Sequence, residues 1–180
     1  FSAISKSTFA NAAMSTRLQH APQRLFWSGL QSYRDVIQLL QHIRQGNHPH
    51  INSNAEIDLF GYSIGSLLSQ ILMMSNPDGL FDDTRLFIFC GGPTLDRMEP
   101  VSKYIMDSEA NIALYAYYFQ RLEKELQRND RLARHFDENR KAATYFRSLL
   151  NYYRFQDHRE KRFYELKDQI AGVGLMKDHV

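Results

Sequence analysis

The sequence contains one cysteine, Cys90, in 180 residues. A single thiol excludes an internal disulfide bond and favours a reducing compartment, so we expect a cytoplasmic protein. No apolar run approaches the ~20 residues that a spanning helix needs, which excludes a membrane span. The chain also lacks an excess of one charge, because 22 basic and 20 acidic side chains leave a formal charge of +2. This balance argues against a nucleic-acid or membrane-surface partner.

Apolar side chains make up 43% of the chain, enough at this length to bury one sizeable core. Residues 1–20 indicate a loop with room for a short helix. From about Gln23 to Gln45 the pattern predicts a long amphipathic helix, which Pro22 opens. Its apolar stripe is Phe26, Leu30, Tyr33, Ile37 and Leu40.

The middle of the chain predicts a strand, a helix and a second strand. Residues 57–60 are a short strand candidate, and an apolar helical face begins after Ser63. Residues 86–90 are a continuous apolar run, which is typical of a strand covered on both faces of a parallel sheet. Residues 94–167 are helical in pattern, and 170–176 resemble a third buried strand. The expected fold class is therefore α/β.

The sequence Gly61-Tyr62-Ser63-Ile64-Gly65 connects the first strand to its helix. A serine at the apex of a tight strand–turn–helix has a strained backbone, and the residues two before and two after it crowd each other. Gly61 and Gly65 have no Cβ atoms to clash there. Such a turn directs the serine hydroxyl out of the carboxyl end of the sheet, with the Ile64 N–H beside it.

This stretch resembles the nucleophile elbow of the α/β-hydrolase superfamily. The helix over residues 31–44 and the run "RLFIFCGGP" resemble the elements on either side of that elbow. The resemblance covers most of residues 23–93 and 169–180. It implies a partial hydrolase core, residues 1–95 and 169–180, with a helical lid inserted over residues 96–168.

The resemblance also implies site residues and a reaction. Ser63 would be the nucleophile, the Ile64 N–H an oxyanion-hole donor, and the bond attacked an ester, thioester or amide. "GVGLMKDHV" is similar to the strand end that carries the catalytic acid, which assigns that role to Asp178. Asp96 is the second candidate, because some relatives place their acid after the preceding strand. Asp58 is expected to be structural.

The sequence supplies no usable histidine. His179 adjoins Asp178, so its side chain should diverge from that carboxylate, and the other histidines precede the acid. His48 and His50 form an H-x-H pair without acidic or cysteine companions, which indicates a solvated loop rather than a metal site. We therefore expect an internal piece of a longer hydrolase, with the base and a second oxyanion donor outside it. Neither a metal nor a cofactor is expected.

Two other functions remain open. The fold could serve as a non-catalytic, hydrolase-like scaffold whose lid binds a partner, or residues 95–168 could be a helical interaction module. The aromatic residues at the start of the lid either line a substrate pocket or pack the lid onto the core. They are Tyr115, Tyr117, Tyr118 and Phe119. The sequence leaves the substrate and the oligomeric state open.

Overall fold

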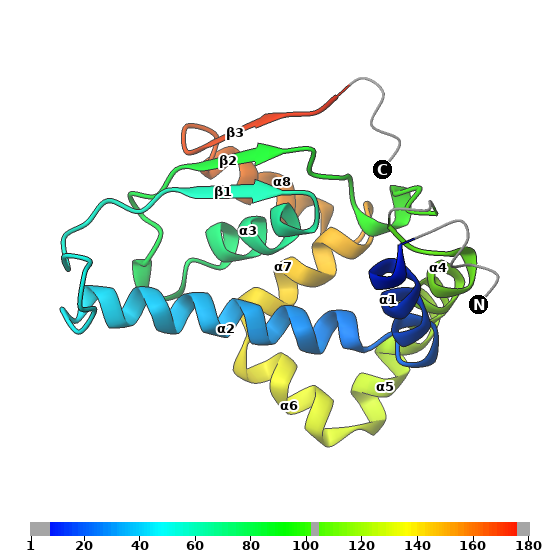
Figure 1. The fold of residues 1–180 in the computed structure, drawn as a ribbon. Coiled ribbons are helices and arrows are strands. Elements are labelled where there is room, and N and C mark those ends of the chain that lie inside the picture. The colour runs from blue at the N-terminus through cyan, green and yellow to red at the C-terminus, as the bar shows by residue number, and fades with distance from the viewer. Residues whose placement is uncertain (1–7, 102–104, 176–180) are drawn as a thin grey trace.

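The computed structural model describes residues 8–101 and 105–175 (Figure 1). Its elements are α1 (Phe9–His20), α2 (Arg24–Arg44), β1 (Leu59–Tyr62), α3 (Ile64–Ser75), β2 (Leu86–Phe89), α4 (Ser108–Tyr115), a π-helix (Ala116–Arg121), α5 (Leu122–Arg128), α6 (Asp130–Glu138), α7 (Arg140–Leu150), α8 (Gln156–Glu165) and β3 (Ile170–Val173). Short 3₁₀ turns cover Pro77–Gly79 and Leu95–Arg97. Within the described ranges, no helix is both long and apolar enough to cross a membrane. The expected α/β class is confirmed.

The strands form one parallel sheet in the order β1-β2-β3. Gly61 of β1 pairs with Ile88 of β2, which in turn pairs with Gly172 of β3. Because all three strands run the same way, their carboxyl ends meet at one edge, on the right in Figure 1. Open α/β sheets bind their ligands at this edge.

One face of the sheet is exposed, which corrects the expectation that the second and third strands are covered on both faces. Side chains alternate between the faces of a strand. Leu86 is 1% exposed on the side that α3 covers, whereas Phe60 is 66% and Phe87 41% exposed on the other. Val173 of β3 is exposed as well. In this protein the apolar runs of β2 and β3 therefore form strands that are covered on one face of the sheet.

Helix α2 forms where its apolar stripe predicts it. Phe26, Leu30, Tyr33 and Leu40 are buried, because their spacing places them on the face toward α3 and α7. Residues 9–20 form a full helix, α1, rather than mostly loop. The Thr8 hydroxyl accepts a hydrogen bond from the Asn11 N–H at 3.2 Å and caps α1, which packs against α4.

The helices of residues 108–165 share one core with α2 and α3. Phe146 of α7 lies 5.5 Å from Phe26 of α2 between ring centroids. Tyr117 and Tyr118 are buried in this core, so packing is the role of these two rings in the structure. A separately folding module over residues 95–168 fits poorly with such a shared core, and the division into hydrolase core and lid stays a prediction.

Tyr118, in the π-helix, is inserted into the first turn of α2. In an uninterrupted helix the Phe26 N–H would bond to the Pro22 carbonyl. Instead, the Tyr118 hydroxyl accepts from the Phe26 N–H at 2.9 Å and donates to the Pro22 carbonyl at 3.1 Å. Burial raises the pKa of Tyr118, so the hydroxyl stays protonated and can donate.

We expect Tyr118→Phe to lower the free energy of unfolding by about 1–2 kcal/mol, because the buried Phe26 N–H loses its acceptor. Urea denaturation of the wild type and the variant measures this difference. Tyr164→Phe is the matched control, since Tyr164 is 70% exposed and should unfold at the wild-type midpoint. Equal midpoints for all three proteins would show that the inserted hydroxyl contributes no stability.

Candidate functional site

Ser63 has an unusual backbone conformation. Its φ is 50° and its ψ is −124°, between the last residue of β1 and the first residue of α3. A positive φ is uncommon for a residue with a side chain and costs about 1–3 kcal/mol. The strained turn that the motif predicts is therefore present at Ser63.

The sheet and the helix together hold this turn. The Ser63 N–H donates to the Phe89 carbonyl at 3.3 Å and extends the pairing of β1 with β2. The Ser63 carbonyl accepts from the Ser66 N–H at 2.9 Å in the first turn of α3. Ser63 itself is exposed at the carboxyl edge of the sheet. Its hydroxyl is thus accessible to a substrate, while its backbone is bonded on both sides.

The two glycines of the motif differ in their surroundings. A Cβ atom at Gly61 would lie 2.9 Å from the Ser66 Cα, a separation that requires backbone movement. Gly61 therefore lets α3 approach β1 closely. A Cβ atom at Gly65 would meet nothing within 4 Å, so the expectation that Gly65 relieves a clash is wrong. The residue that crowds Gly61 is Ser66, three positions after Ser63, rather than Gly65, two positions after it.

Gly61→Ala is expected to lower the free energy of unfolding by about 1–3 kcal/mol, because the added methyl group pushes α3 away from β1. Gly65→Ala is the matched control and is expected to be neutral or stabilising by up to about 1 kcal/mol, since its methyl group enters free space. Thermal unfolding compares the two variants. Equal destabilisation by the two variants would contradict the difference in packing between Gly61 and Gly65.

The N-terminus of α3 adjoins the Ser63 hydroxyl. The first amides of a helix have no partner within the helix, and its dipole favours negative charge at this end. Within residues 8–101 and 105–175, no hydrogen bond occupies the Ile64 N–H. This amide is therefore available to an oxyanion that forms next to Ser63.

Two features beside the turn were not predicted from the sequence. A Cβ atom at Gly91, in the loop after β2, would lie 2.8 Å from the Ser66 Cβ, so this loop packs on α3. The Ser66 hydroxyl is buried and has no hydrogen-bond partner among the described residues. The Gly91-Gly92-Pro93 sequence signals a tight loop, but nothing local indicates that the loop touches Ser66.

Both Asp96 and Asp58 bind partners other than histidine. The two carboxylate oxygens of Asp96 each accept from the Tyr152 N–H at 3.0 Å, which ties the loop after α7 to the turn after β2. Asp58 accepts hydrogen bonds from the side chain and backbone of Arg85, and these lower the pKa of Asp58. Its expected structural role fits this pair. Asp178 lies outside the described residues.

Three of the described histidines contact groups other than Ser63 or a candidate catalytic acid. His48 Nδ1 accepts from the backbone N–H groups of His50 and Ile51, His135 lies edge-on to Trp27, and His158 stacks on Tyr145. In the part of the chain that the structure describes, no hydrogen bond joins a histidine to Ser63. The same part contains no group of three or more potential metal ligands. His179 lies outside it.

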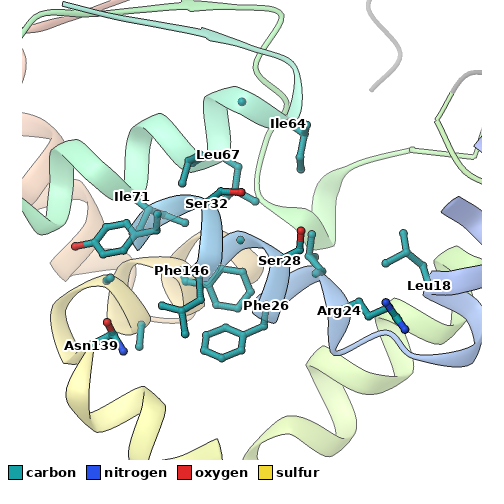
Figure 2. Close-up of a pocket in the computed structure, with 18 of the residues that line it drawn as sticks. Leu18, Arg24, Phe26, Ser28, Ser32, Ile64, Leu67, Ile71, Asn139 and Phe146 are labelled. Atoms are coloured by element: carbon teal, nitrogen blue, oxygen red, sulfur yellow. The ribbon is translucent and has the colours of Figure 1, made fainter. Parts of the chain in front are cut away.

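A cavity of about 460 Å³ begins beside the turn and extends between α2 and α3 (Figure 2). Ile64 and Gly65, the two residues after Ser63, line one part of it. Phe26 of α2, Leu67 of α3 and Phe146 of α7 form much of its apolar wall. The cavity depends on the packing of several helices, and no local pattern in the sequence indicates it.

Comparison with known proteins identifies a family but no characterised relative. A search of curated proteins and a search of solved structures each find no match. A family model matches residues 3–180, nearly the whole chain. The chain therefore belongs to DUF6051, a family of unknown function.

Proposed function

We propose that Ser63 is the nucleophile of a serine hydrolase of the α/β-hydrolase type, which acts on an ester, thioester or amide bond. The observation that carries the proposal is the backbone of Ser63, whose φ of 50° and ψ of −124° hold an exposed serine between a parallel strand and a helix N-terminus. An ordinary connecting turn could avoid the cost of this conformation. Strain of this kind concentrates at functional sites.

In the proposed reaction the Ser63 Oγ attacks the substrate carbonyl carbon and gives its proton to a general base. The carbonyl oxygen becomes an oxyanion, which the Ile64 N–H and the α3 N-terminus stabilise. The leaving group takes the proton and departs, and the acyl group remains on Ser63 until water releases it. We assign the base to a histidine outside residues 1–180 and the carboxylate that orients this histidine to Asp178.

A fluorophosphonate probe tests the proposal, because it forms a covalent bond only with an activated serine. We expect the folded full-length protein to be labelled and the heat-denatured protein to remain unlabelled. Folded full-length protein that stays unlabelled, while a known serine hydrolase reacts in the same tube, would contradict the proposal.

A non-catalytic scaffold is the second candidate. It is favoured by the hydrogen bonds that tie Asp96 to Tyr152 and by the lack of a described histidine bonded to Ser63. In this case the turn at Ser63 would only connect β1 to α3 and would have no catalytic role. The scaffold predicts a folded full-length protein that neither reacts with the probe nor hydrolyses esters.

A further inference from the structure

We propose that the cavity between α2 and α3 binds a single-chain amphiphile with an anionic head, of which a long-chain carboxylate is the simplest form. The cavity volume of about 460 Å³ falls within the range of small-molecule sites. The inference rests on the lining of the cavity and on the charges at its mouth. It does not depend on the chemistry of Ser63.

The wall that holds the alkyl chain consists of aliphatic and aromatic side chains from separate helices. Phe26 belongs to α2, Leu67 and Ile71 to α3, and Phe146 to α7. Figure 2 shows these side chains directed into a common space. Transfer of an alkyl chain from water into such surroundings is favourable for every methylene group that becomes buried.

The charged residues of the lining are two cations, Arg17 and Arg24. Arg17 lies in the last turn of α1 and Arg24 begins α2, so both stand where these helices meet. Figure 2 shows Arg24 beside Leu18 of α1. Both arginines are exposed, and no ion pair among the described residues involves either.

The acidic counterpart of these cations is missing from the cavity. Among the described residues, neither Asp nor Glu lines it. A guanidinium group binds a carboxylate or phosphate through paired hydrogen bonds. An apolar space with two unpaired guanidinium groups at one end therefore fits a molecule with an alkyl chain and an anionic head.

Gly29 of α2 offers a way to fill the cavity. It lies on the cavity wall, and a Cβ atom there meets nothing within 4 Å. Gly29→Phe adds a ring at the cavity wall, and its Cβ atom meets no other group within 4 Å, whereas Gly29→Ala adds only a methyl group. Glycine is less favourable in a helix interior than alanine or phenylalanine, so neither substitution should weaken α2.

Titration of the full-length protein with dansylundecanoic acid, followed by fluorescence, measures binding. We expect saturable binding by the wild type, binding by Gly29→Ala within about twofold of it, and at least about tenfold weaker binding by Gly29→Phe. Ser63→Ala should bind like the wild type, which separates this inference from the proposed hydrolase. An unsaturable wild-type titration, or equal affinities of Gly29→Phe and Gly29→Ala, overturns the proposal.

Competition tests the anionic head independently of Gly29. Dodecanoate or dodecyl phosphate should displace the probe more strongly than dodecanol, and the tighter of the two anions identifies the head group. Arg17→Gln combined with Arg24→Gln should raise the inhibition constant of the tighter anion about tenfold and leave the inhibition constant of dodecanol unchanged. Competition by dodecanol equal to that of both anions would contradict an anion site at the mouth.

Discussion

Ser63→Ala is expected to lower the rate of ester hydrolysis by the full-length protein at least about 10³-fold, because no other group can replace the attacking oxygen. Turnover of a panel of nitrophenyl esters by the wild type and the variant measures this loss. The fold should be retained, since the bonds that hold the turn come from the Ser63 backbone rather than its hydroxyl. The loss therefore reports on chemistry rather than on stability.

Ser66→Ala is the control for this prediction. Its hydroxyl is buried three residues further along, in the first turn of α3. It makes no hydrogen bond among the described residues, so its removal should leave the rate within about twofold of the wild type. Wild-type turnover by Ser63→Ala, or an equal loss in both variants, would contradict the assignment of Ser63 as the nucleophile.

Arg159→Met is expected to lower the free energy of unfolding by about 3 kcal/mol. Arg159 is 5% exposed and donates from Nη1 to the Ser148 carbonyl and from Nη2 to the Tyr152 carbonyl, each at 2.6 Å. The Ser148 carbonyl is in the last turn of α7, where no helical N–H can reach it, and the Tyr152 carbonyl is in the loop after α7. A cation here also interacts favourably with the negative end of the helix dipole. Methionine would leave these acceptors with no partner.

Urea denaturation of Arg159→Met and Lys161→Met measures this effect. Lys161 lies exposed on the same helix, α8, so its replacement should change the free energy of unfolding by less than about 0.5 kcal/mol. A loss of under about 1 kcal/mol in Arg159→Met would show that water or other groups satisfy the carbonyls of Ser148 and Tyr152.

Local pattern predicts much of this fold. The stripe from Phe26 to Leu40 specifies α2, because one face of a helix must meet the core. The Gly61-to-Gly65 motif likewise specifies the change from strand to helix, since the strained residue and its neighbours are adjacent in sequence. Helix α2 and the turn at Ser63 both depend on residues that are close together in the sequence, so the sequence pattern alone predicts them.

Features that depend on distant segments could not be predicted in this way. The run from Leu86 to Phe89 is equally apolar whether one face or both are covered, and only the segments that pack on the sheet decide between the two. Asp96 follows a strand as a catalytic acid could, yet it bonds to Tyr152, 56 residues later. The cavity and the insertion of Tyr118 into α2 likewise arise from tertiary packing.

A crystal structure of the full-length protein after reaction with an aryl phosphonate tests the central claim most directly. The account predicts a phosphonyl group bonded to the Ser63 Oγ, a positive φ at Ser63, and the phosphonyl oxygen within hydrogen-bond distance of the Ile64 N–H. An unmodified Ser63 within a continuous helix, with a negative φ, would contradict it.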